Sequence, residues 1–99
     1  MEFTSNPIIV VGAGVAGLAA GRELLRAGLA PIVLEARDRI GGRILTVHDS
    51  KSPFPIELGA EFVHGRHPAL WKVLEESDVP VQPVAGGGDR DEIDAFSKR

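Results

Sequence analysis

The chain has 99 residues, of which 43% are hydrophobic and 25% are charged, and its formal net charge is −3. This composition is typical of one small globular α/β domain and excludes a strongly basic nucleic-acid-binding surface. No cysteine is present, which excludes disulfides and thiol catalysis within this sequence and leaves the redox compartment open.

Residues 1–6 form an N-terminal extension that lacks a basic start and an apolar core. We therefore expect no signal peptide and, by default, a cytoplasmic location. The longest apolar run is too short to cross a bilayer, so no membrane association is expected.

The next segment is a short apolar run that leads into a glycine-rich turn. Pro7–Val11 predicts a strand of a parallel sheet that is covered on both faces. In the turn that follows, Gly12 allows a sharp change of direction and Gly14 allows the main chain to touch a pyrophosphate. Gly17 allows the following helix to pack closely on the sheet. The spacing is that of a dinucleotide-binding turn.

A helix is expected from Gly14 or Val15 to Ala27, with Gly28 as its left-handed cap. Its N-terminus would present unpaired N–H groups and the positive end of the helix dipole to the two phosphates of a dinucleotide. The sequence lacks the Gly-Lys-Ser/Thr ending of a P-loop. The cofactor-binding residues expected in the turn are Gly12, Gly14, Val15, Ala16 and Gly17.

A second strand over Pro31–Leu34 ends at Glu35. The Glu35 carboxylate can accept hydrogen bonds from both hydroxyls of an adenosine ribose. A 2′-phosphate would be repelled there, which disfavours NADP.

Three arginines and a glycine pair follow Glu35 in the segment E-A-R-D-R-I-G-G-R. Arginines beside a glycine turn can add charge-assisted hydrogen bonds to a phosphate, and we expect this of Arg37 and Arg43. The alternative is a solvated loop with surface charges, which is the interpretation we favour for Arg39. Ala36 and Gly42 are also expected at the cofactor.

Val10–Arg43, with this segment, resembles the N-terminus of the flavin-containing amine oxidases, which include monoamine, polyamine and L-amino-acid oxidases and flavin-dependent histone lysine demethylases. The resemblance implies FAD as cofactor and oxidation of an amine or amino acid by hydride transfer to the flavin, with peroxide formed from oxygen. Phytoene desaturases and protoporphyrinogen oxidases share the glycine-rich turn and the Gly-Gly-Arg. A related desaturase or porphyrinogen-type oxidase is therefore one alternative, and a non-catalytic nucleotide-binding fragment is another.

A second motif, E-L-G-A-E-F-V-H-G over Glu57–Gly65, is similar to the segment beneath the flavin ring in polyamine-oxidase-like members. The resemblance implies that His64 faces the amine, to which an imidazole could form a hydrogen bond. A structural histidine at the sheet edge is an equal alternative. His48 and His67 share no ligand spacing with His64, so no metal site is expected. By the same resemblance the ring would be contacted by Leu58, Gly59, Ala60, Glu61 and Phe62.

The remaining expected elements are a hairpin, a helix and an extended edge segment. Trp71 is expected to pack at the border of the helix rather than to bind a cofactor. The elements are a strand over Ile44–His48, a turn over Asp49–Pro53, a strand over Phe54–Glu57, a helix over Pro68–Ser77 and an extended segment over Val79–Val84.

The predicted fold class is therefore α/β, a partial Rossmann-like FAD-binding fold over residues 7–84, with a flexible charged tail or the start of a missing region over 85–99. A domain of this size buries only about two-thirds of its unfolded surface. We expect a fragment or split subunit that completes its core with the remaining polypeptide of an oxidase or a second subunit. The lysine that holds a water near the flavin in the family has no matching motif at Lys51, Lys72 or Lys98.

Overall fold

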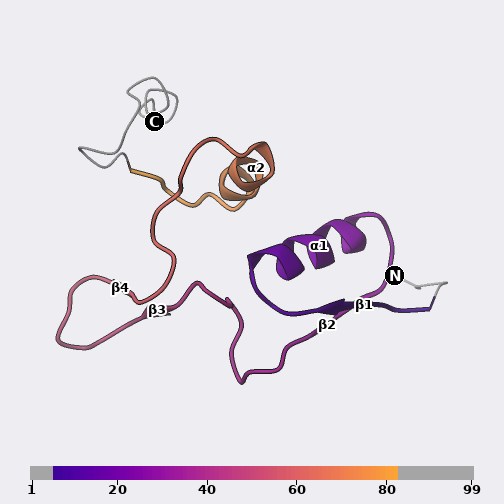
Figure 1. Cartoon of the computed structure of the whole chain (residues 1–99), viewed down its shortest axis with the longest axis horizontal. Coiled ribbons are helices and arrows are strands. Elements are labelled where there is room, and N and C mark those ends of the chain that lie inside the picture. The colour runs from indigo at the N-terminus through magenta and orange to yellow at the C-terminus, as the bar shows by residue number, and fades with distance from the viewer. Residues whose placement is uncertain (1–5, 83–99) are drawn as a thin grey trace. The chain divides into compact units, whose positions relative to one another are not determined.

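The computed structural model describes residues 6–82, and the chain divides into two compact units, Met1–Phe62 and Val63–Arg99. The order of the elements confirms the predicted β-α-β unit, hairpin and second helix (Figure 1). The first unit holds β1 (Ile8–Val11), α1 (Val15–Arg26), β2 (Pro31–Leu34), β3 (Thr46–Val47) and β4 (Ile56–Glu57), and the second holds α2 (Pro68–Glu76).

The β-α-β unit is a two-stranded parallel sheet with α1 as its crossover (Figure 1). In the register of the two strands, Val10 pairs with Val33 and Val11 with Leu34. The N–H of Gly12 donates to the Leu34 carbonyl at 2.7 Å, which extends the ladder to the first residue of the glycine-rich turn. The end of β2 and the start of the turn are therefore held side by side.

The two faces of this sheet differ sharply in burial. On the α1 face, Val10 and Val33 are half-buried, and each lies near a glycine of the helix. On the opposite face Val11 is 85% exposed. Two strands and one helix supply a single covering layer within residues 6–82, and the predicted cover on the second face would have to come from elsewhere. The exposed apolar residues, called the outer sheet face below, are Ile9, Val11, Ile32 and Leu34.

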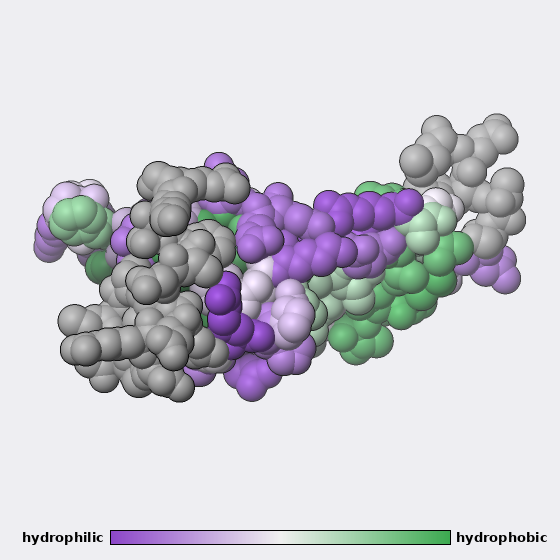
Figure 2. Space-filling model, turned by 90° about the horizontal axis from the view of Figure 1, so that it is seen from above, coloured by the Kyte–Doolittle hydropathy of each residue, from purple (hydrophilic) through white to green (hydrophobic). Residues whose placement is uncertain are grey.

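The interior of the described region is correspondingly small. Ala13, 2% exposed, is the one buried hydrophobic side chain between residues 6 and 82. Figure 2 shows hydrophobic residues gathered into a continuous surface over the part of the chain that holds β1, β2 and α1. Parallel sheets are usually covered on both faces, and within residues 6–82 this one is covered on one.

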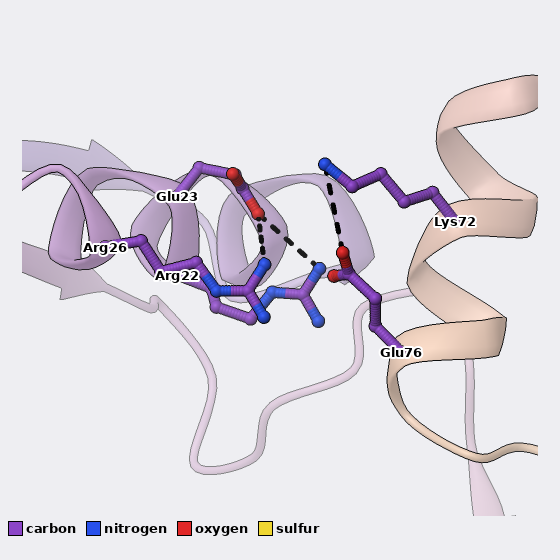
Figure 3. A network of polar contacts seen from close by, with 5 residues as sticks. All are labelled: Arg22, Glu23, Arg26, Lys72 and Glu76. Carbon is purple, nitrogen blue, oxygen red and sulfur yellow. Dashed lines mark hydrogen bonds and ion pairs between the residues drawn. The ribbon is translucent and has the colours of Figure 1, made fainter.

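Helix α1 ends as the sequence predicts, with Gly28 in the left-handed region at φ 77°. The N–H groups of Leu29 and Gly28 donate to the carbonyls of Leu24 and Leu25, both at 3.0 Å, which is the hydrogen-bond pattern of a Schellman cap. On the surface of the helix, the Glu23 carboxylate contacts the guanidinium groups of Arg22 at 3.7 Å and Arg26 at 2.9 Å (Figure 3). The pair with Arg26 is exposed and contributes little stability, while Arg22 is half-buried.

The hairpin is shorter than predicted, since β3 and β4 have two residues each. Pro53 and Pro55 lack the N–H that a longer ladder would need. Pairing instead continues beyond the other end of the hairpin, where Leu58 N–H donates to the Leu45 carbonyl at 2.8 Å and Ala60 N–H to the Arg43 carbonyl at 2.9 Å.

In the second unit, α2 begins at Pro68, as predicted, and carries a half-buried Trp71. The indole N–H donates to the Gly65 carbonyl at 3.1 Å, and the Arg66 guanidinium lies 5.5 Å from the ring centroid. These contacts fit a structural role for the tryptophan. An exposed ion pair between Lys72 and Glu76, at 3.8 Å, lies along the same helix (Figure 3).

The C-terminal expectations fall largely outside the described residues. Val79–Gln82 form no strand, and the rest of the predicted segment, together with the tail from residue 85, lies beyond residue 82. Between residues 6 and 82, neither helix has the length and apolar character needed to cross a membrane.

Candidate functional site

The glycine-rich turn is shaped by main-chain contacts that side chains would prevent. Gly12 has φ +99°, which disfavours any residue with a Cβ. A Cβ at Gly17 would overlap the carbonyl oxygen of Gly12. The first turn of α1 therefore lies directly against the end of β1, as the sequence predicts for Gly17.

The first N–H groups of α1 have no acceptor within the helix itself. Gly14 is the N-cap residue and offers no side chain, and the first turn contains no acidic residue. N–H groups left unpaired by the helix and the helix dipole favour an anion at this position. No carboxylate in the first turn would compete with a phosphate there.

The Glu35 carboxylate lies at this turn. One of its oxygens accepts a hydrogen bond from the N–H of Ala13 at 2.8 Å, and the other accepts from the N–H of Arg37 at 2.9 Å. These bonds, first that from Ala13, lower the pKa of Glu35. The carboxylate is thus ionised at neutral pH, and each oxygen keeps lone-pair capacity for a further donor such as a ribose hydroxyl.

The second glycine pair packs against the same turn. The N–H of Gly41 donates to the Ala13 carbonyl at 2.8 Å, and Gly41 forms a parallel bridge with Gly14. A Cβ on Gly42 would lie only 3.3 Å from the Gly14 Cα, and both glycines of the pair have positive φ, 106° and 60°. The two glycine-rich segments therefore meet main chain to main chain. We call this region, residues 12–17, 35 and 41–42, the glycine corner.

The three arginines of the loop behave differently. Arg39 is half-buried, and its guanidinium donates to the Gly42 carbonyl at 2.9 Å and to two further carbonyls. Arg37 reaches the Gly42 carbonyl only at 3.5 Å. Arg43 is exposed, and its side chain has no hydrogen bond or ion pair within residues 6–82. Arg39 is therefore not the solvated surface charge expected of it, and the phosphate contacts expected of Arg37 and Arg43 stay predictions.

The expected ring-binding segment lies beside the chain that leaves the glycine corner. Its pairing brings Ala60 to the carbonyl of Arg43. A Cβ at Gly59 would overlap that same oxygen, so the glycine is needed for close approach of the protein to itself, whatever lies on it. Leu58 and Phe62 are both exposed. The Glu57 carboxylate accepts from the Thr46 hydroxyl, with O–O distances of 2.7 and 2.8 Å.

The structure brings together most of the predicted site residues within the first unit. His64 is exposed and belongs to the second unit, so its predicted contact with the amine stays a prediction. Sequence reasoning missed two residues of the glycine corner and its loop, Ala13 and Arg39. Ala13 is recognisable by its place between the first two glycines, whereas nothing in the sequence shows that Arg39 would bind main-chain carbonyls.

Comparison with known proteins gives a consistent result. The family profile described as "Flavin containing amine oxidoreductase" matches residues 15–98. Lysine-specific histone demethylase 1 homolog 2 of Oryza sativa subsp. japonica is 52% identical over 78 residues, which are 78% of this chain and 10% of that protein. Polyamine oxidase 2 of Arabidopsis thaliana is 42% identical over 86 residues, 87% of this chain and 15% of that protein.

Solved structures give the same picture. The structure of wild-type putrescine oxidase bound to putrescine matches with a TM-score of 0.59 and 39% identity, over 72% of this chain and 16% of that chain. A triple mutant of the same enzyme matches with a TM-score of 0.60 and 42% identity. The chain therefore spans only a small part of the length of the relatives that it matches, and that part is their N-terminal region.

Proposed function

Because the chain belongs to the flavin containing amine oxidoreductase family, we propose that it supplies the FAD-binding corner of an amine oxidase. The observation that carries this proposal is the position of the Glu35 carboxylate, 2.8 Å from the Ala13 N–H at the N-terminus of α1. It places a carboxylate suited to a ribose beside main-chain N–H groups suited to phosphate. The family uses FAD, which contains both a ribose and phosphates.

The residues present fit an adenine dinucleotide. The main chain of Gly14–Gly17 would bind the pyrophosphate, since α1 has no side-chain cap and no acidic residue in its first turn. Arg43, exposed and beside the glycine corner in sequence, would add a charge-assisted hydrogen bond. Glu35 would accept hydrogen bonds from the adenosine ribose, and its negative charge would disfavour a 2′-phosphate.

The segment 58–62 would lie along the flavin ring. Its support is the pairing of Ala60 with Arg43, which holds this segment next to the chain that leaves the glycine corner. When bound, FAD would supply the redox chemistry, accepting a hydride from an amine and passing the electrons to oxygen to give peroxide. The contribution of this chain is to bind and orient the cofactor.

The rest of the oxidase would come from further polypeptide. The outer sheet face is the support for this part of the proposal, since four apolar side chains on it are exposed, Val11 to 85%. Parallel sheets are stable with both faces covered. The remaining polypeptide of the oxidase, or a second subunit, would cover this face and bind the amine.

FAD binding by the 99-residue chain tests the first part of the proposal. Titration of FAD, followed by its fluorescence, is expected to give saturable binding that is competed by ADP. Glu35→Gln should weaken it, because an amide cannot offer two anionic oxygens to the ribose. Arg26→Gln, which removes an exposed ion pair in the last turn of α1, at the opposite end of the helix from the glycine corner, is the matched control. Absence of saturable binding by the wild-type chain would contradict the proposal.

The second test concerns activity and co-expresses the chain with a neighbouring reading frame that would supply the rest of an oxidase. A yellow complex that forms peroxide from an amine such as putrescine supports an amine oxidase. A yellow complex without peroxide contradicts oxidase activity and supports a non-catalytic nucleotide-binding module or a desaturase-type enzyme. A colourless complex contradicts all three.

A further inference from the structure

Three main-chain carbonyls converge on the guanidinium of Arg39. Its Nη2 donates to the Gly42 carbonyl at 2.9 Å, and its Nη1 lies 3.3 Å from the Ile40 carbonyl and 3.4 Å from that of Ile44. The same turn is closed by the Ile44 N–H, which donates to the Gly41 carbonyl at 3.0 Å. A planar guanidinium can serve several acceptors at fixed angles, and a lysine ammonium cannot reproduce this arrangement.

One peptide group connects Arg39 to the glycine-rich turn. In a planar trans peptide, the C=O and the following N–H point in opposite directions. The Ile40 carbonyl accepts from Arg39, and the N–H of the same peptide, that of Gly41, donates to the Ala13 carbonyl at 2.8 Å. Arg39 therefore fixes the orientation of a peptide whose other side bonds to the turn.

The same geometry applies one peptide further along. The Ala13 carbonyl that accepts from Gly41 shares a peptide group with the N–H of Gly14. Because the carbonyl points toward Gly41, the Gly14 N–H must point the opposite way. This N–H belongs to the N-cap residue of α1 and is one of the donors available to an anion there.

Arg37 and Arg43 cannot replace Arg39 in this role. Arg37 contacts only the Gly42 carbonyl, at 3.5 Å, and Arg43 is exposed with no hydrogen bond within residues 6–82. Arg39 is thus the loop arginine whose guanidinium makes the most hydrogen bonds to the main chain of the loop, with three carbonyl acceptors.

We propose that Arg39 is a positioning residue, which orients the Gly14 N–H toward the pyrophosphate through the peptide groups 40–41 and 13–14. The inference rests on the proposed binding of a dinucleotide at the glycine corner. It separates the loop arginines into one that shapes the site from within and one, Arg43, that is open to the ligand.

The test compares ADP with adenosine, which carries the ribose but no phosphate. Dissociation constants are measured by NMR titration of the full chain as wild type, Arg39→Gln, Arg39→Lys and Arg26→Gln. Arg39→Gln is expected to weaken ADP binding by about tenfold, since an oriented hydrogen bond to a charged group is lost. Adenosine binding should change by less than about twofold, because Glu35 is untouched. The ADP affinity of Arg39→Lys should lie between those of the wild type and Arg39→Gln, and that of Arg26→Gln should match the wild type.

Unchanged ADP affinity in Arg39→Gln would overturn the inference, as would equal weakening of ADP and adenosine, which indicates general destabilisation. A wild-type chain that binds ADP no better than adenosine would overturn the proposed function, and the inference with it. If Arg39→Gln does not fold, hydrogen exchange in Arg39→Lys decides. Faster exchange of the Gly41 amide than in the wild type supports the inference, and unchanged exchange contradicts it.

Discussion

The glycine corner and the outer sheet face lie in the same unit but are stabilised by different means. At the glycine corner, the N–H of Gly41 donates to the Ala13 carbonyl at 2.8 Å. The N–H groups of Ala13 and Arg37 donate to the Glu35 carboxylate at 2.8 and 2.9 Å. On the outer sheet face, Val11 is 85% exposed and meets no covering layer within residues 6–82. β1 and the turn that follows it thus connect an apolar surface that is exposed to a turn whose main-chain groups are hydrogen-bonded.

The difference shows which parts of such a fold can form locally. Hydrogen bonds among residues 12–17, 35 and 41–44 need only the β-α-β unit and its following loop. Burial of Ile9, Val11, Ile32 and Leu34 needs a second layer that this unit does not supply. The hydrogen bonds of the glycine corner can therefore form while the outer sheet face is still uncovered.

The strongest test of the glycine corner is Gly17→Ala. Its Cβ would overlap the Gly12 carbonyl, a main-chain atom that cannot move without opening the turn. We expect a loss of about 3 kcal/mol or more in the free energy of unfolding, measured by urea denaturation.

Gly21→Ala is the matched control, on the same helix. There the nearest atom is a methyl of Val33 at 3.2 Å, which can shift. The gain in helix propensity, about 1 kcal/mol, should offset the crowding. Equal losses in the two variants would contradict the special role of Gly17.

A second test contrasts neighbouring residues of β1. Val10→Thr places a hydroxyl on the α1 face and should cost about 1–2 kcal/mol of unfolding free energy. Val11→Thr places it on the outer sheet face, where the chain alone should lose less than about 0.5 kcal/mol. If Val11→Thr proved as costly as Val10→Thr, the outer sheet face would have to be covered in solution.

With the remaining polypeptide present, the relative effects of Val10→Thr and Val11→Thr should change. Val11→Thr is then expected to weaken assembly, because a hydroxyl would be buried against the covering layer. Analytical ultracentrifugation of the co-expressed parts measures this effect, with Arg26→Gln as a variant that should assemble normally.

A smaller effect concerns pH. Main-chain hydrogen bonds, chiefly that from Ala13, lower the pKa of Glu35 in the folded state. A carboxyl with a lowered folded pKa stabilises the fold above its unfolded pKa and loses that contribution as pH falls through the folded value. The stability difference between wild type and Glu35→Gln should therefore be largest near neutral pH and shrink in acid. Urea denaturation at several pH values checks it, and a difference that does not vary with pH would contradict the assigned bonds.

Much of the first unit was predictable from sequence because its signals are local. An apolar β-branched run, a glycine-rich turn and a left-handed glycine after a helix give β1, α1 and the cap at Gly28 within a few residues. Pro68 likewise marks the start of α2. Each of these depends on a residue's own conformational preference and not on distant contacts.

The rest depended on contacts that a linear pattern does not contain. The hairpin strands were predicted too long because the prediction did not account for Pro53 and Pro55, which have no N–H to donate to a ladder. Arg39 was predicted to be a surface charge because the sequence does not show where main-chain carbonyls point. In the structure Gly41 and Gly42 have positive φ values, and the carbonyls of this turn converge on the Arg39 guanidinium. The sequence of one strand shows that its side chains are apolar, but it does not show whether another layer covers them.

The central claim is that the N-terminus of α1 binds the pyrophosphate of a dinucleotide beside Glu35. Titration of the isotope-labelled chain with ADP, followed amide by amide, tests it most directly. We expect the largest saturable shifts at the main-chain amides of Gly14–Gly17, with smaller shifts at Ala13 and Arg37, whose N–H groups donate to Glu35. Saturable shifts centred on α2 or the β3–β4 hairpin, with the glycine-rich turn unaffected, would contradict the account.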